Sequence, residues 1–141
     1  FLPEIFFMNA PETIQKILHE SKNIAVVGLS DDPSRYSYKV ASFLMLNGFE
    51  IIPVNPNIDS WRGKKSYAKL SDILIKIDVV DIFRKSEFVK EIVEEAIAIR
   101  AKAIWMQEGV VDENAARYAE TKGLLVVMDR CMMKEFVNLK K

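Results

Sequence analysis

Five short apolar runs, rich in β-branched residues, alternate along the chain with segments of helical periodicity. The runs span residues 23–29, 49–54, 78–83, 101–106 and 124–128. Regular alternation of strands and helices is typical of βαβ units, which build a parallel sheet. The first run reads NIAVVGL, and an uninterrupted apolar stretch of this kind is expected in a strand buried on both faces. The sequence therefore predicts an α/β fold, a doubly wound domain with a mainly parallel five-stranded sheet.

Residues with helix-capping chemistry stand at the borders of the helical segments. Pro11 suits the first turn of a helix that precedes the first strand. Ser86 and Asp112 are each predicted to cap an amphipathic helix, the second one ending near Lys122. Residues 70–74 are expected to form one helical turn, and the tail after the fifth strand a short helix. On the helix after Ser86, these charged side chains are expected to face solvent: Lys90, Glu91, Glu94 and Glu95.

The chain has the length and composition of one globular domain. It holds 141 residues, half of them hydrophobic and 28% charged, which is enough to bury a core. We expect this domain over residues 9–141, after an N-terminal extension over residues 1–8. The extension is apolar, so we predict that it docks on the domain or on a second subunit of a homo-oligomer. The docking side chains would be Phe1, Leu2, Ile5, Phe6 and Phe7.

Charge and cysteine content argue against several classes of function. Twenty basic residues balance twenty acidic ones, whereas non-specific nucleic-acid binding relies on a basic surface. One cysteine cannot form an internal disulfide, and no Cys/His cluster has metal-ligand spacing. No apolar run approaches the roughly 20 residues that span a bilayer, and residues 1–8 lack the basic start of a signal peptide. We predict a soluble cytoplasmic protein that binds neither nucleic acid, membrane nor metal.

The loop after the first strand has residues suited to binding a phosphate. Ligands of open parallel sheets bind outside the carboxyl ends of the strands. Here Gly28 allows close approach to the backbone, and the following helix start offers N–H groups and a partial positive charge. Ser30 and Ser37 add hydroxyls, and Arg35 adds a bidentate cation, with Lys39 nearby. The GxGxxG pattern of dinucleotide-binding domains is absent.

Loops after the second and third strands supply further candidates. An NAD-binding domain usually has an acidic residue after its second strand, to hold the ribose hydroxyls. This chain has Asn55-Pro56 there, with Asp59 as the nearest acid, which weakens the case for NAD. After the third strand, Phe83 and Arg84 could stack on a base or pair with a phosphate.

The fourth and fifth loops offer few groups for chemistry. Gln107 and Gly109 follow the fourth strand and could line a channel for an amide-containing arm. Glu108 and Asp129 are the carboxylates at strand ends, and we expect both on the solvated surface. Cys131 follows the fifth strand, and no histidine near it in sequence could activate it. We therefore expect this cysteine to be a small buried apolar residue.

Together these loops resemble the CoA-binding-domain family, the stand-alone CoA-binding proteins of bacteria and archaea. The resemblance covers nearly the whole chain from Asn23 to Met133. The matching stretches are VVGLSDDPSRYSYKVASFL, GFEIIPVNP, VDIFRKSEFV, AIWMQEGVVDENAA and GLLVVMDRCM. It implies a single Rossmann-like domain, also found as the first domain of the succinyl-CoA synthetase alpha subunit. The stretch WRGKKSY departs from the family pattern by its added positive charge.

The resemblance also implies a ligand, coenzyme A or acyl-CoA, and a place for each of its parts. The residues implied around the pyrophosphate are Gly28, Ser30, Arg35, Ser37 and Lys39. Those implied beside the adenosine are Asn55, Pro56, Phe83 and Arg84. Gln107 and Gly109 would lie toward the pantetheine arm.

We predict a binding protein without catalysis. The synthetase reaction needs a phosphorylatable histidine and an ATP-grasp partner, whereas His19 lies on the first helix and the chain has no second domain. Two alternatives stay open. One is an NAD(P)-binding oxidoreductase or redox-sensing domain on the same fold; the other is a protein-interaction domain without a ligand. A bound acyl group would call for an acyl-transfer partner protein.

Overall fold

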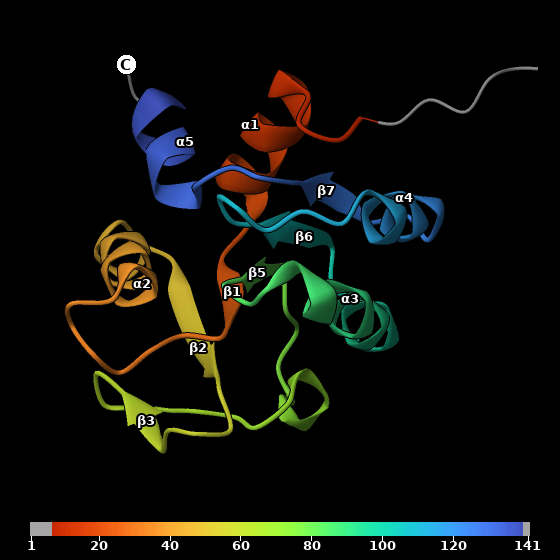
Figure 1. Ribbon diagram of the computed structural model, residues 1–141. Coiled ribbons are helices and arrows are strands. Elements are labelled where there is room, and N and C mark those ends of the chain that lie inside the picture. The colour runs from red at the N-terminus through yellow and green to blue at the C-terminus, as the bar shows by residue number, and fades with distance from the viewer. Residues whose placement is uncertain (1–6, 140–141) are drawn as a thin grey trace, which may run out of the picture.

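The computed structural model describes residues 7–139, which form a sheet with helices on both of its faces (Figure 1). Its strands are β1 (Asn23–Val27), β2 (Glu50–Val54), β3 (Ser60–Trp61), β4 (Lys64–Lys65), β5 (Val79–Ile82), β6 (Ala103–Met106) and β7 (Leu125–Val127). Its α-helices are α1 (Pro11–Glu20), α2 (Tyr36–Leu46), α3 (Val89–Ala98), α4 (Glu113–Thr121) and α5 (Met132–Leu139). Two 3-10 turns, η1 (Leu70–Asp72) and η2 (Ser86–Phe88), complete the described elements.

The main sheet has five strands in the order β2-β1-β5-β6-β7, and every neighbouring pair is parallel. Each strand lies within one of the five predicted runs, so the predicted doubly wound α/β fold is confirmed. Numbered along the chain, the order is 2-1-3-4-5, one of the two common doubly wound orders. The strand order reverses between β1 and β5. In such sheets this switch point, at the carboxyl ends of the two strands, is where ligands bind.

Successive side chains of a strand point to opposite faces of the sheet, so alternate residues pack in two separate cores. On one face, Val80 and Ile82 of β5 pack in a cluster with α3, α4 and η1. On the other face, Val79 belongs to a cluster with α1, α2 and α5. Figure 1 shows α3 and α4 together on one side of the sheet, opposite α2. Two cavities open at the carboxyl ends of the strands.

Helix borders agree with the sequence in part. The Asp112 carboxylate caps α4, since its Oδ1 accepts a hydrogen bond from the Ala115 N–H at 3.0 Å. The predicted cap at Ser86 is wrong: Ser86 begins η2, and its hydroxyl accepts from the Val111 N–H at 2.9 Å. A tertiary contact to the loop after β6 thus uses the oxygen that a cap would need. The predicted helical turn at residues 70–74 and the predicted C-terminal helix are both present, as η1 and α5.

A two-stranded antiparallel hairpin, β3–β4, lies in the loop after β2. Arg62 and Gly63 form its turn with positive φ values of 48° and 80°, the geometry of a tight hairpin. Trp61 of this hairpin is buried and packs edge-on against Tyr38 of α2 at a centroid distance of 5.6 Å. The hairpin therefore closes one end of the α2-side core.

The residues before α1 run beside β7. The Asn9 N–H donates to the Val126 carbonyl at 3.3 Å, and the Asn9 side chain exchanges two hydrogen bonds with the Met128 main chain. Phe7 has an exposed ring, while its N–H donates to the Glu120 carboxylate. The other residues predicted to dock, Phe1 to Phe6, lie outside the described range. Within residues 7–139, none of the helices has the length and apolar character needed to cross a membrane.

Candidate functional site

Gly28 ends β1 with a backbone that only glycine adopts easily. Its φ is +86°, and a Cβ placed there would lie 2.6 Å from the Phe83 carbonyl oxygen. Its N–H donates to the Val54 carbonyl of β2 at 2.9 Å. The close packing of the ends of β1, β2 and β5 therefore requires glycine at this position. The sequence interpretation gave a different reason, the close approach of a ligand to the backbone.

The loop after Gly28 is held together by its own side chains. The Ser37 hydroxyl accepts from the Ser30 N–H at 3.0 Å, and the Ser30 hydroxyl accepts from the Asp32 N–H at 3.0 Å. The Asp32 carboxylate accepts from both the N–H and the hydroxyl of Ser34. These two hydrogen bonds lower the pKa of Asp32. The loop is thus preorganised, and the side chain of Arg35, the residue before α2, is exposed.

Asn55 links the loops after β1 and β2. Its Nδ2 donates to the Leu29 carbonyl at 2.9 Å, and its Oδ1 accepts from the Asn57 N–H at 2.9 Å. Its main-chain N–H donates to the Tyr67 carbonyl. The side-chain amide of Asn55 therefore stabilises the two loops. An NAD-binding domain usually has a ribose-binding acid at this position.

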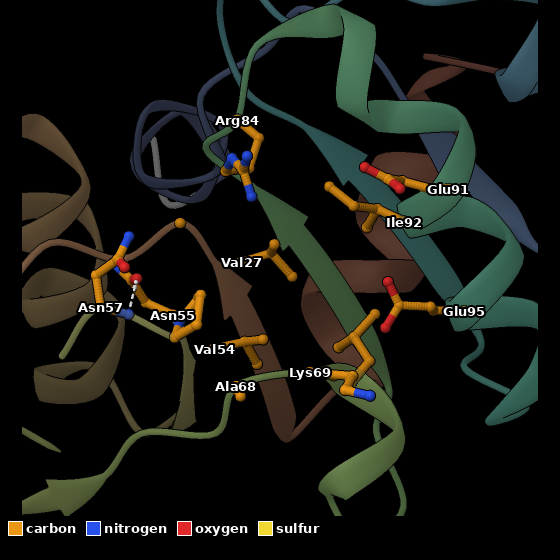
Figure 2. Close-up of a pocket in the computed structure, with 13 residues that line it drawn as sticks. Val27, Val54, Asn55, Asn57, Ala68, Lys69, Arg84, Glu91, Ile92 and Glu95 are labelled. Carbon is orange, nitrogen blue, oxygen red and sulfur yellow. Dashed lines mark hydrogen bonds between the residues drawn. The ribbon is translucent and has the colours of Figure 1, made fainter. Parts of the chain in front are cut away.

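A cavity of 430 Å³ opens at the switch point, and we call it the switch-point cavity. Glu91 and Glu95 of α3 form one wall, across from Asn55 and Asn57, with Arg84 at one end (Figure 2). Its lining also includes Val27, Gly28, Val54, Pro56, Ala68, Lys69, Leu70 and Ile92. Burial raises the pKa of Glu95 despite the nearby Lys69. The cavity thus offers carboxylate acceptors on one wall and a guanidinium at its end.

A second, more open cavity of 570 Å³ lies over the carboxyl ends of β5 and β6, and we call it the outer cleft. Its lining residues are Tyr36, Phe83, Arg84, Lys85, Gln107, Glu108, Gly109, Val110 and Lys134. The Gly109 N–H donates to the Asp129 carboxylate at 2.7 Å, which fixes the loop after β6. Lys134 of α5 pairs with Glu108 at 3.1 Å. The outer cleft is therefore bordered by loops on one side and by α2 and α5 on the other.

Arg84 lines both cavities. Its guanidinium carbon lies 4.1 Å from the centre of the Phe88 ring, a cation–π contact that fixes the side chain. Within residues 7–139, Arg84 forms no ion pair with a carboxylate. A permanent cation that is held in place but not neutralised can attract an anion at the border of the two cavities.

Comparison with known proteins identifies the family. Residues 22–136 match the family described as CoA binding domain. The chain belongs to the CoA binding domain family.

Its relatives in this family include whole chains of similar length. The uncharacterized protein YneT of Bacillus subtilis is 44% identical over 119 residues, which cover 84% of this chain and 88% of YneT. A hypothetical protein from Pyrococcus horikoshii has a solved structure that is 36% identical, covers 100% of both chains and superposes with a TM-score of 0.91. The ADP-forming acetate–CoA ligase II subunit alpha of Pyrococcus furiosus is 32% identical over 71 residues, 50% of this chain but 16% of that subunit.

The structure sorts the predicted site residues of this CoA binding domain into three groups. Gly28, Asn55, Pro56 and Arg84 line the switch-point cavity. Phe83, Arg84, Gln107 and Gly109 line the outer cleft. The four others lie in the loop after β1 or on α2 and line neither cavity: Ser30, Arg35, Ser37 and Lys39. Direct contact of any of these residues with a ligand stays a prediction.

Sequence reasoning missed the wall that α3 contributes to this CoA binding domain. Glu91 and Glu95 were expected to face solvent: Glu91 is exposed as expected, whereas Glu95 is half-buried, and both line the switch-point cavity. Their spacing of four residues puts them on one helical face, which was the available signal. Lys69, Tyr36 and Lys134 also carried no sequence signal. Within the part of the chain that the structure describes, no cluster of His, Cys, Asp and Glu could hold a metal ion.

Proposed function

We propose that this chain binds coenzyme A or an acyl-CoA across the switch-point cavity and the outer cleft, with Arg84 between them. The observation that carries the proposal is that one unpaired arginine borders both cavities at the switch point. Family membership and the similarity to a ligase subunit that acts with CoA support it. Cavities of 430 and 570 Å³ are each in the size range of small-molecule sites.

The charges of the two cavities favour one direction for the ligand. Glu91 and Glu95 would repel a phosphate, but they can accept hydrogen bonds from the adenine amino group or from the one free ribose hydroxyl of CoA, at the 2′ position. We therefore assign the adenosine part to the switch-point cavity and the pyrophosphate to Arg84, with Arg35 and Lys39 at the exposed rim. The pantetheine arm, which is uncharged and has two amides, then lies in the outer cleft beside Gln107.

The NAD alternative has less support. The residue after β2 is Asn55, whose side-chain amide is already bonded to Leu29 and Asn57. It therefore lacks the free carboxylate that holds both ribose hydroxyls in NAD-binding domains.

Ligand-dependent thermal stability tests the proposal. A ligand that binds only the folded state stabilises it by about 2.7 kcal/mol at a hundredfold excess over Kd. We expect a large rise in Tm with CoA and acetyl-CoA and little change with NAD, NADP or ATP, measured by differential scanning fluorimetry. A rise with NAD alone would favour the oxidoreductase alternative. No rise with any of them would favour a protein-interaction domain.

Replacing Arg84 by alanine should weaken CoA binding by about 1–3 kcal/mol, because a charge-assisted hydrogen bond to phosphate is lost. Arg35→Ala tests the rim in the same way, and isothermal titration calorimetry measures both. Arg117→Ala is the matched control, since this arginine is exposed on α4 and lines neither cavity. Unchanged affinity in both the Arg84 and the Arg35 variants would contradict the assignment of the pyrophosphate.

A further inference from the structure

The single cysteine of the chain lies beside the outer cleft. Cys131 stands between β7 and α5, is 2% exposed, and has its Sγ 2.9 Å from the Tyr36 hydroxyl. Tyr36 is the first residue of α2, is 41% exposed and lines the outer cleft. The phenol therefore lies between the buried thiol and the cleft.

Gln107 gives a second, independent sign of a ligand at the same place. It lines the outer cleft, is 2% exposed, and its Oε1 accepts from the N–H of Met132, the residue after Cys131. Its Nε2 has no hydrogen-bond partner among residues 7–139. A buried donor left unpaired is unfavourable, and a carbonyl group of a ligand arm in the cleft would satisfy it.

The groups around Tyr36 keep its hydroxyl available as a donor. Burial, Cys131 and Glu108 all raise the pKa of Tyr36. Glu108 is itself held by Lys134 at 3.1 Å. The phenol thus stays protonated near neutral pH, so its hydroxyl can donate a hydrogen bond to the Cys131 sulfur.

We propose that Cys131 exchanges with disulfides of coenzyme A, so that the chain holds CoA as a mixed disulfide in the outer cleft. This inference rests on the proposed function, because the pantetheine arm must bring its sulfur to the cleft. The Cys131 thiolate attacks the CoA sulfur of a disulfide CoA–S–S–R, where R is a second CoA or another thiol. The Cys131–S–S–CoA bond forms, the S–S bond of the reagent breaks, and the leaving R–S⁻ takes up the proton that Cys131 released. The disulfide is the oxidant, and no other electron acceptor is required.

Intact-mass spectrometry of the reduced, full-length protein tests this step. After incubation with CoA disulfide and removal of the excess reagent, we expect each chain to gain one CoA moiety, which dithiothreitol then removes. Cys131→Ser and Cys131→Ala should both lack the adduct. An adduct that survives in either variant, or its absence in the wild type, would overturn the proposal.

Selectivity separates a built site from a merely reactive thiol. We expect CoA disulfide to react with the wild type at least tenfold faster than oxidised glutathione does. Arg84→Ala should reduce the rate with CoA disulfide more than it reduces the rate with oxidised glutathione, which has no pyrophosphate. Tyr36→Phe keeps the ring but loses the donor, and should slow both reactions about fivefold, the effect of one hydrogen bond. Equal rates with the two disulfides would overturn the proposal.

The two proposals fail in different ways. If calorimetry detects CoA binding under reducing conditions but no adduct forms with CoA disulfide, the proposed function stands and the covalent step is wrong. If neither binding nor an adduct is detected, both are wrong.

Discussion

Replacing Gly28 by alanine should lower the free energy of unfolding by about 2–5 kcal/mol. A non-glycine residue at positive φ costs about 1–2 kcal/mol, and Gly28 has φ +86°. The added Cβ would also lie 2.6 Å from the Phe83 carbonyl oxygen and 3.0 Å from the Arg84 Cδ. Relieving such overlap in packed surroundings costs about 1–3 kcal/mol more. Urea unfolding measures the sum.

Gly109→Ala is the matched control for this prediction. Gly109 has nearly the same φ, +82°, but a Cβ there would meet no atom within 4 Å. We expect it to lose only the backbone part, about 1–2 kcal/mol. Equal destabilisation by the two variants would mean that the contact with the Phe83 carbonyl contributes nothing. At temperatures where both variants stay folded, Gly28→Ala should also weaken CoA binding more than Gly109→Ala does. Relief of the overlap at Gly28 moves the backbone of Phe83 and Arg84.

Replacing Asp81 by asparagine should stabilise the protein increasingly as the pH rises. Asp81 lies in the middle of β5 with 0% exposure, and neither carboxyl oxygen has a hydrogen-bond partner among residues 7–139. Burial raises the pKa of Asp81 well above its usual value. The unfolded state therefore releases a proton, above about pH 4, that the folded state retains. The contribution of Asp81 to the stability of the wild type is therefore fully present below that pH and is lost as the pH rises toward the folded pKa.

The difference between variant and wild type isolates this effect. The side-chain amide of the Asp81→Asn variant cannot ionise, so its advantage should be constant near pH 3 and grow by up to about 1.4 kcal/mol for each pH unit above pH 4. Guanidinium unfolding at a series of pH values measures the difference. Glu95→Gln is a useful comparison, because the Glu95 pKa is also raised, but this side chain is only half-buried; we expect a smaller effect. A pH-independent difference for Asp81→Asn would show that this carboxyl ionises normally in the fold.

The sequence was sufficient to predict the fold and the edge of the sheet that holds the cavities. All five main strands lie in the predicted apolar runs, because a strand buried on both faces must be apolar along its whole length. Parallel strands place their carboxyl ends at one edge, so the loops containing Gly28, Asn55, Arg84 and Gln107 could be predicted to converge. The Asp112 cap was equally predictable, because its partner lies three residues away.

Contacts between residues far apart in the sequence were decided only by the tertiary structure. Ser86 bonds to Val111 instead of capping its own helix, and the Tyr36 hydroxyl meets Cys131 across 95 residues. Glu95 lies on a cavity wall because of the orientation in which α3 packs against β5 and η1. The pattern of polar residues on α3 does not specify that orientation. Local patterns determine which residues form strands and helices, since those preferences act over a few positions. The partner of each polar group depends on how whole elements pack, and only the folded chain specifies that.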